Sequence, residues 1–434
     1  MNKDERKQKI HSITGGDVYV SKSGTGKRLL YRGKTEEFRI VEIPMEFLVL
    51  NVENGRIASL VKSFEKEHGP LNPEKESDAE TLSQFLYEAH DAQNKRTKED
   101  LAKNGQLEAG IITSDGIIVD GNRRFSLMWA IAHDPKSSPD EKARCSVFRT
   151  VVLPEDADTK EILRLETSFQ MGADEKVGYN AIEKYLHAYD MKEQGFSVKE
   201  IAEYMGYDKT SEVDELLEVK TLIDEYLDWC DCSGIYTRLP RGFEDDLLKL
   251  NGACKKIRKG SISWIPPVEL EEVENDLKCM SYDYIRLNMK SEDGFDFRAI
   301  ASTSNNNFLG DENIWRQIVQ DWSKTTGSVE EEPIDDVLNR SQSTTDTKRL
   351  LEERDNKWRK QVKDGLKEAF STANNVIENK KEKDKPAQLI KKAASALREV
   401  DLSAISSIKN FNEINENLAE IQAIVEKISE ITTH

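Results

Sequence analysis

Two adjacent arginines, Arg123 and Arg124, are the side chains whose type and position most directly indicate chemistry. They follow Gly121 in the stretch SDGIIVDGNRRFSLMWAIA (114–132), where an apolar strand pattern passes directly into an apolar helix pattern. A helix that begins there leaves several backbone N–H groups without partners, and guanidinium groups beside them are suited to phosphate oxygens. Gly121 would let a ligand approach the backbone closely. The pattern therefore indicates an anion-binding turn.

The same arginines have a second interpretation, in which they only hold the protein together. A buried guanidinium is costly without an anion, and that anion can come from the chain itself. Asp120 and Glu166 are carboxylates that could pair with the two arginines. The region would then be a non-enzymatic scaffold for protein contacts. The local sequence leaves both interpretations open.

Composition sets the class of protein. The chain has 434 residues, of which 37% are hydrophobic and 7% aromatic, which is enough for two or three domains with apolar cores. No apolar run is long enough to span a membrane, and the polar N-terminus does not resemble a secretory signal. The five cysteines lack zinc-site spacing, as expected in a reducing compartment. We therefore expect a cytoplasmic protein without membrane contacts.

Charge is distributed unevenly along the chain. Residues 151–345 carry 22 basic and 41 acidic side chains, a net charge of −19, which exceeds the −18 of the whole chain. An acidic surface repels phosphate backbones, whose neutralisation by Lys and Arg supplies most non-specific affinity for nucleic acid. The middle of the chain is therefore not expected to bind DNA through its general surface.

The order of strand and helix patterns predicts an α+β fold. β-rich stretches and a tight-turn signal at Ser114-Asp115-Gly116 lie in the first third of the chain, and helical patterns dominate afterwards. The expected parts are an N-terminal arm (1–35), a mixed α/β domain (36–155) with an insertion near 70–95, an acidic helical domain (156–327), a linker (328–348) and long C-terminal helices (349–434).

The C-terminal part has apolar residues at steps of three and four, which is typical of long amphipathic helices. Pro386 is expected to mark the break between two such helices. They could pack as an antiparallel hairpin on their own protein, or associate with a second chain as a coiled coil and form a dimer.

A helix-turn-helix pattern occupies residues 196–220, with Gly206 in the turn and a second helix from about residue 210. From Asp208 to Glu218 the stretch carries five acidic side chains against Lys209 alone. Helices that read DNA normally present Arg, Lys, Asn or Gln. DNA binding through this helix is therefore disfavoured, and contact with a protein partner or a purely structural role is preferred.

Four segments in order resemble the ParB/sulfiredoxin-like superfamily followed by a helix-turn-helix. They are an "IP…N…R" opening (38–60), a "GQ" box before a strand and a "DGNRR" turn (105–130), a glutamate-led box (162–175) and the helix-turn-helix (196–216). The resemblance covers roughly residues 36–225. It implies a ParB-like mixed α/β domain that binds a nucleotide, either CTP or ATP.

The resemblance also implies roles for individual residues. Gly121, Asn122, Arg123 and Arg124 would hold the phosphates. Gly105 and Gln106 would line the nucleoside side, and Glu166 would lie near a magnesium ion. Further candidates are Arg56, Asp120, Thr167 and Gln170.

This sequence also departs from the family pattern. Asn122 stands where partition proteins have glutamate and where sulfiredoxins have their reactive cysteine, so sulfiredoxin chemistry is not expected. The glutamate box reads Glu-Thr-Ser-Phe-Gln (166–170), without the usual arginine, which weakens the case for magnesium-dependent hydrolysis. We therefore expect a nucleotide-binding switch, with slow triphosphate hydrolysis as one option, in a bacterial DNA-related process such as partition or phage defence. A DNA-binding protein or ParB-like nuclease and a non-enzymatic scaffold are the alternatives.

Overall fold

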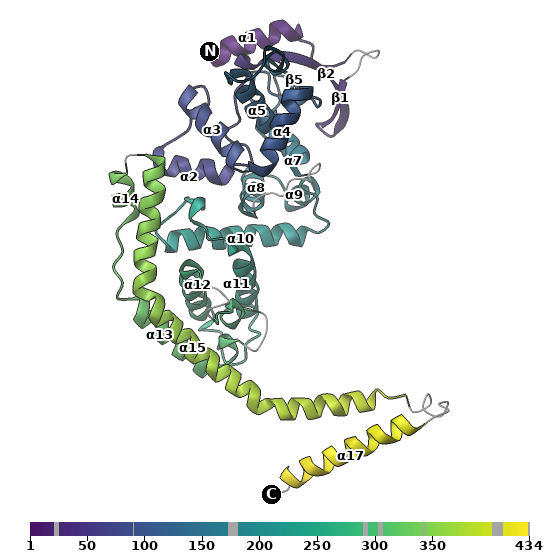
Figure 1. Cartoon of the computed structure of the whole chain (residues 1–434), viewed down its shortest axis with the longest axis vertical. Helices are drawn as coiled ribbons and strands as arrows, with labels where there is room; N and C mark the ends of the chain where they lie inside the picture. The colour runs from purple at the N-terminus through teal and green to yellow at the C-terminus, as the bar shows by residue number, and fades with distance from the viewer. Residues whose placement is uncertain are drawn as a thin grey trace. The chain divides into compact units, whose positions relative to one another are not determined.

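The computed structural model describes residues 1–20, 26–89, 91–171, 181–289, 294–302, 307–341, 343–401 and 411–432. The chain forms two compact units, Met1–Ala373 and Asn374–His434. The first unit combines a five-stranded sheet with many helices, so the predicted α+β class is confirmed (Figure 1). None of the described helices combines the length and apolar character that crossing a bilayer requires.

The sheet has the strand order β1-β2-β5-β3-β4. Strands β3 and β5 run parallel, and the other neighbours are antiparallel. The predicted hairpin around Ser114-Asp115-Gly116 joins β3 to β4. The strands are β1 (Gly26–Tyr31), β2 (Lys34–Pro44), β3 (Gly110–Ile112), β4 (Ile118–Asp120) and β5 (Val147–Val152).

Apolar side chains of the sheet point alternately to its two faces, as the strand geometry requires. Ile112 and Ile118 join a core that includes residues of α1 to α5, whereas Ile111 and Val119 join a second core with Leu165 of α7. Both faces are therefore covered by helices. These helices are α1 (Lys3–Thr14), α2 (Ala58–His68), α3 (Glu76–Glu88), α4 (Asp91–Asn104), α5 (Asn122–His133) and α7 (Thr159–Met171), with the short α6 (Pro139–Arg144) before β5.

The predicted N-terminal arm is instead part of the folded domain. Ile10 of α1 is 1% exposed and belongs to the first core, and β1 pairs with β2 along six residues. The predicted insertion near 70–95 forms α3 and the beginning of α4, with Leu82 and Leu86 buried. Both segments thus contribute apolar surface to the core around the sheet.

The helical part of the first unit is built around α10. This helix packs against α8 and α9 on one side and against α11 and α12 on the other (Figure 1). The helices are α8 (Ala181–Glu193), α9 (Val198–Met205), α10 (Thr210–Trp229), α11 (Phe243–Arg258), α12 (Leu270–Leu287), α13 (Glu312–Thr326) and α14 (Ile334–Arg340). Single turns of 3-10 helix are described at Met45–Phe47, Tyr236–Arg238, Phe297–Ala299 and Phe308–Gly310.

The expected linker at 328–348 also differs in the structure. It contains α14, whose Ile334 and Val337 are buried, and the first turn of α15 (Thr344–Arg398). The first unit continues to Ala373, well beyond this segment. One of the segment's acidic side chains, Glu331, pairs with the buried Arg286, whereas Glu332 pairs with the exposed Arg340.

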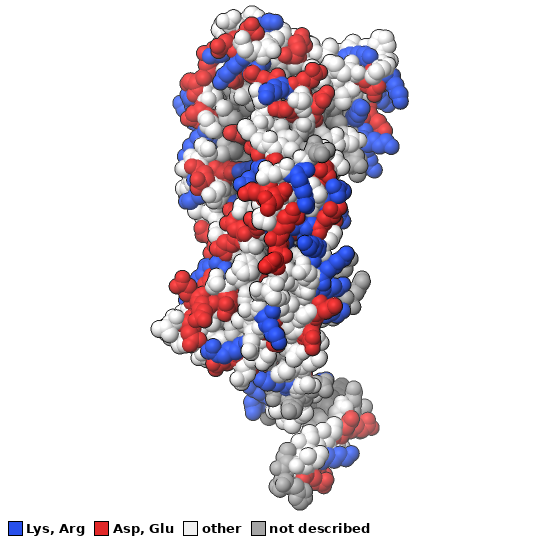
Figure 2. All heavy atoms as spheres, turned by 90° about the vertical axis from the view of Figure 1, so that its left-hand side faces the viewer, with Lys and Arg blue, Asp and Glu red and all other residues white. Residues whose placement is uncertain are grey.

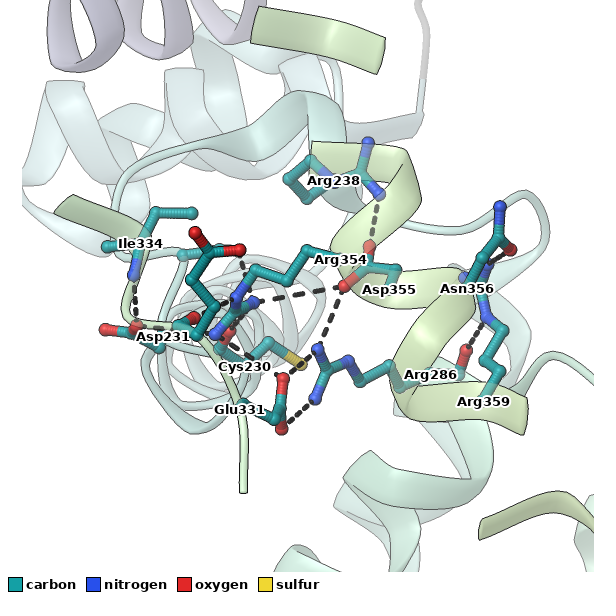
Figure 3. A network of polar contacts seen from close by, with 12 residues as sticks. Cys230, Asp231, Arg238, Arg286, Glu331, Ile334, Arg354, Asp355, Asn356 and Arg359 are labelled. Carbon is teal, nitrogen blue, oxygen red and sulfur yellow. Dashed lines mark hydrogen bonds and ion pairs between the residues drawn. The ribbon is translucent and has the colours of Figure 1, made fainter. Parts of the chain in front are cut away.

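A buried network of charges attaches α15 to the rest of the first unit (Figure 3). Arg286 of α12 donates to both carboxylate oxygens of Glu331 at 2.7 and 2.6 Å and lies 2.9 Å from Asp355 of α15. Asp355 also pairs with Arg238, and Arg354 donates to the Cys230 carbonyl oxygen at 3.0 Å. Although burial acts to raise the pKa of Asp355, Arg238 and Arg286 hold it below its ordinary value.

The C-terminal helices differ from the prediction at Pro386. Helix α15 runs continuously through this proline to Arg398, and the second long helix is α17 (Asn412–Thr432). A proline inside a helix removes one backbone hydrogen bond and costs about 3 kcal/mol. Lysine and alanine residues around it are strong helix formers, which offset that cost over a long helix. The expectation of a break at Pro386 was therefore wrong, because the helix ends only after Arg398.

Candidate anion-binding site at the start of helix α5

Helix α5 begins where the sequence predicted, directly after Gly121. Gly121 has a left-handed backbone with φ of 104°, and no side chain caps the helix at this position. A Cβ atom at residue 121 would lie 2.9 Å from Cζ of Phe148. Glycine is thus required here by the backbone angle and by the neighbouring ring, independently of any ligand.

Asn122 has a structural role in the turn. Its side chain is 3% exposed. The Oδ1 atom accepts a hydrogen bond from the backbone N–H of Asn51 at 2.9 Å, and Nδ2 donates to the Ile118 carbonyl oxygen at 2.8 Å. Asn122 therefore joins the loop after β2 to strand β4.

The side chains of Arg123 and Arg124 point to different parts of the domain. Arg123 donates from Nε to Oδ1 of Asn94 at 2.6 Å and from Nη2 to Oγ1 of Thr97 at 3.2 Å, both on α4. Arg124 lies 3.2 Å from Oδ2 of Asp120 and donates from Nη1 to the Glu108 carbonyl oxygen at 2.7 Å. Consecutive helical residues are about 100° apart around the axis, so neighbouring side chains do not share a face.

Three cations from three different elements converge on the "GQ" box. Lys27 of β1 donates to the Ala109 carbonyl oxygen at 2.6 Å, and Arg124 donates to that of Glu108. Arg149 of β5 donates to the carbonyl oxygens of Gln106 and Leu107 at 3.1 and 3.2 Å. We call Lys27, Arg124 and Arg149 the cationic cluster.

Gln106 and Gly105 shape the backbone that the cationic cluster contacts. The Gln106 amide donates to the carbonyl oxygens of Glu108 and Arg149 and accepts from the Arg149 N–H at 2.7 Å. Gly105 has a left-handed φ of 72°, which ends α4 and turns the chain toward β3. Both residues therefore position the cluster rather than present polar groups of their own.

Two carboxylates, Asp120 and Glu108, lie within 4 Å of the cationic cluster, and Glu42 of β2 is the cross-strand neighbour of Arg149. Asp120 lies 3.6 Å from Lys27 and 3.2 Å from Arg124, so one carboxylate serves two cations. Glu108 lies 3.7 Å from Arg124, but its side chain is 88% exposed and therefore well screened. Burial lowers the pKa of Lys27, Asp120 opposes that shift, and the positive charge of Arg124 adds to it. An anion bound here would relieve this repulsion.

The stretch SKSGTGKRLL (21–30), which contains Lys27, lacks the spacing of a phosphate loop and was not expected to bind a nucleotide. Arg149 was not singled out, because only the fold brings β1, β5 and α5 to one loop. The alternation in CSVFRTVVLP (145–154) gave one usable signal. It places Arg149 on a strand otherwise rich in apolar side chains.

Glu166 lies elsewhere, in the wall of a cavity. Its side chain is 2% exposed, and its Oε1 atom accepts a hydrogen bond from the backbone N–H of Gly55 at 3.0 Å. The cavity has a volume of about 460 Å³ and lies between α2, α7, α8 and the β3–β4 hairpin. Its other charged lining residues are Glu53, Lys62, Glu65, Asp190 and Glu193. This acidic lining disfavours a phosphate.

The residues around Glu166 also do not fit a magnesium site made by the protein alone. In the described ranges, no group of three or more His, Cys, Asp or Glu side chains is arranged to hold a metal ion. Of the remaining candidates, Thr167 is hydrogen bonded to Nε2 of His187 at 2.7 Å, and the N–H of Arg56 donates to Oδ1 of Asn54 at 3.0 Å. The side chain of Gln170 lies outside the described residues.

Known proteins offer no further guidance. No family model, curated protein or solved structure matches the chain. The ParB-like interpretation therefore depends on the quoted motifs alone.

The exposed surface of the helix-turn-helix carries the acidic side chains for which DNA binding was not expected. Helix α10 begins at Thr210, after Gly206 in a left-handed turn, and Ile201, Ala202 and Met205 of α9 are buried as predicted. Glu212, Asp214 and Glu215 lie in its exposed first turns. Figure 2 shows carboxylates gathering over the middle of one face of the molecule.

One buried carboxyl group next to the cavity gives a pH-dependent prediction. Glu183 of α8 is 2% exposed and accepts hydrogen bonds from the N–H and Oγ of Ser59. Burial raises its pKa from 4.5 to about 7. Its contribution to stability is therefore fully present below about pH 4.5 and is lost as the pH rises through 7.

We expect Glu183→Gln to gain on the order of 2 kcal/mol relative to the wild type when urea unfolding is moved from about pH 5 to about pH 8. The amide keeps the shape without acquiring a charge. Glu193→Gln, at an exposed cavity-lining residue at the end of the same helix, is the control and should show no such change. Equal pH dependence in the wild type and Glu183→Gln would contradict the assignment.

Proposed function

We propose that the first unit binds the polyphosphate of a nucleoside triphosphate, CTP or ATP, at the cationic cluster, and that occupancy switches contacts with a partner. The observation that carries this proposal is the convergence of Lys27, Arg124 and Arg149 on residues 106–109. All three donate to neutral carbonyl oxygens there, and Asp120 is the one partly buried carboxylate paired with them in the described part of the site. A phosphate could accept hydrogen bonds from these side chains in place of the carbonyl oxygens.

The beginning of α5 adds to this support. Gly121 leaves the helix without a side-chain cap, and the partial positive charge of a helix N-terminus attracts anions. The order of motifs resembling ParB-like proteins is consistent with a nucleotide, and a role in partition or phage defence follows from that resemblance alone. Arg123 is not part of the proposed contact, because it faces α4.

The test is titration calorimetry of the full chain with the four nucleoside triphosphates and inorganic triphosphate, with and without magnesium. Arg124→Gln should weaken binding roughly tenfold to a hundredfold, which corresponds to the loss of one charge-assisted hydrogen bond. Arg149→Gln should act in the same direction. Glu108→Gln should leave binding unchanged or tighten it, because it removes an opposing negative charge.

Arg316→Gln on α13 is the matched control. Arg316 is an exposed arginine with two carboxylate partners, Glu269 and Glu312, far from the cluster in sequence. It should leave nucleotide affinity unchanged. The proposal fails if none of the five ligands binds the wild type, or if Arg124→Gln and Arg149→Gln both bind as the wild type does.

A second candidate function, a non-enzymatic scaffold, is favoured by the Arg124–Asp120 ion pair, which that interpretation predicted. Its other predicted pair is not observed, since Arg123 contacts α4 and Glu166 accepts from Gly55. The two functions differ in the titration, because a scaffold binds no triphosphate.

A further inference from the structure

Helix α17 of the second compact unit carries a continuous apolar face that is exposed at some positions and partly buried at Ile414, Ile421 and Ile428. Its apolar residues follow one another at steps of four and three, which places them along one side of the helix. Leu418 and Val425 are 51% and 54% exposed, and Ile424 and Ile431 beside them are also exposed. The residues in step are Ile414, Leu418, Ile421, Val425 and Ile428.

The last part of α15 has a shorter apolar face, which spans residues 389–397. Ile390, Ala393 and Leu397 recur at steps of three and four, and Leu389 lies next to them. Leu389, Ile390 and Leu397 are all exposed in the single chain. Exposed apolar faces of this length on a water-soluble helix indicate an association surface.

Both faces are wider than a two-helix contact requires. In each helix the apolar residues occupy the two seam positions of a heptad and the position before the first of them, for example Ile424 before Val425 and Leu389 before Ile390. A seam of two positions suits a pair of helices, whereas three positions suit a bundle. Pairing these helices within one chain would therefore leave a second apolar stripe exposed.

The charges of the two helices are opposite. Residues 376–398 carry seven basic and three acidic side chains, a net charge of +4. Residues 412–432 carry five acidic side chains and one lysine, a net charge of −4. Opposite charges beside apolar seams select partner and orientation in helical assemblies.

We infer that this surface binds a second copy of the same chain, forming a bundle in which the basic end of α15 from each copy lies against the acidic α17 of the other. A two-fold arrangement makes each such contact twice, because each chain carries both halves of the pair. A foreign partner would have to supply both a basic and an acidic apolar helix, which the chain already contains. The inference is independent of nucleotide binding.

Light scattering of the full chain after size-exclusion chromatography tests the inference. The wild type at micromolar concentration should have about twice the 49.5 kDa chain mass. The double variant Leu418→Asp, Val425→Asp should have the mass of one chain, because it places charges in the apolar face. Val268→Asp, at an apolar residue of the first unit that is 89% exposed, is the control and should remain a dimer.

A charge exchange keeps the test independent of any unfolding of α17. Glu420 and Lys392 occupy the same heptad position on their helices, next to the apolar face. Glu420→Lys should weaken dimerisation by on the order of tenfold, and adding Lys392→Glu in the same chain should restore it. A monomeric wild type, a dimeric Leu418→Asp, Val425→Asp variant, or an exchange that restores nothing would each overturn the inference.

Discussion

Replacing Asp355 by alanine is expected to lower the free energy of unfolding by about 3 to 5 kcal/mol. Asp355 is 6% exposed and pairs with two arginines, Arg238 and Arg286, that are themselves largely buried. Removing the carboxylate leaves the guanidinium groups of Arg238 and Arg286 in the interior without one of the negative charges that offset their desolvation. Urea unfolding monitored by tryptophan fluorescence would measure the loss, since the ring centroid of Trp358 lies 4.3 Å from Cζ of Arg286.

Two variants separate the charge of Asp355 from its shape and its position. Asp355→Asn keeps the shape of the side chain but removes its charge. It should therefore show most of the loss in unfolding free energy expected for Asp355→Ala. Glu353→Ala removes an exposed ion pair with Arg349 on the same helix and should cost no more than about 1 kcal/mol. Equal losses in Asp355→Ala and Glu353→Ala would show that the network does not attach α15.

Gly121→Ala is expected to destabilise the protein by about 2 to 4 kcal/mol, even without any nucleotide. About 1 to 2 kcal/mol comes from the left-handed backbone, since φ at residue 121 is 104°. The rest comes from the added Cβ atom, which would lie 2.9 Å from Phe148. Thermal or urea unfolding of the unliganded protein measures the sum.

Gly195→Ala is the matched control for Gly121→Ala. Gly195 has a left-handed φ of 79°, but no heavy atom lies within 4 Å of the position of an added Cβ. It should therefore cost only the backbone part, about 1 to 2 kcal/mol. If Gly121→Ala costs no more than Gly195→Ala, the Phe148 ring makes no contribution and glycine at 121 is not fixed by packing.

Local patterns predicted the elements around the turn well. The β3–β4 hairpin followed from Ser114-Asp115-Gly116, and α5 begins at the residue after Gly121. The turn after α9 was predicted from Gly206, which has a left-handed backbone there. Each of these signals acts within a few residues, which is why sequence alone was sufficient.

Long-range pairing could not be predicted in the same way. The Arg238–Asp355 contact joins residues 117 positions apart, and the acidic stretch that resembled a linker supplies Glu331 to Arg286. Composition records how many charges a segment has and not which partner the fold places beside it. The end of the first unit at Ala373 and the packing of α1 also depend on contacts between distant parts of the chain, so the sequence did not predict them.

The candidate site was predicted in part. Arg124, Gln106 and Gly121 come together, but Lys27 and Arg149 were not expected, and Glu166 lies in a separate acidic cavity. The divergence of Arg123 and Arg124 was predictable in principle. Once α5 was expected to begin at residue 122, the two side chains had to point about 100° apart.

The ring of Phe148 lies against two glycines, Gly110 and Gly121, and limits which residues can replace them. At Gly110 an added Cβ would lie 2.6 Å from the ring and 2.7 Å from the backbone oxygen of Asp120. At Gly121 the left-handed φ alone excludes most side chains. A smaller side chain at 148 would therefore free neither position. Phe148 is itself fully buried in the core, so a smaller side chain there would leave a cavity while residues 110 and 121 remained glycine.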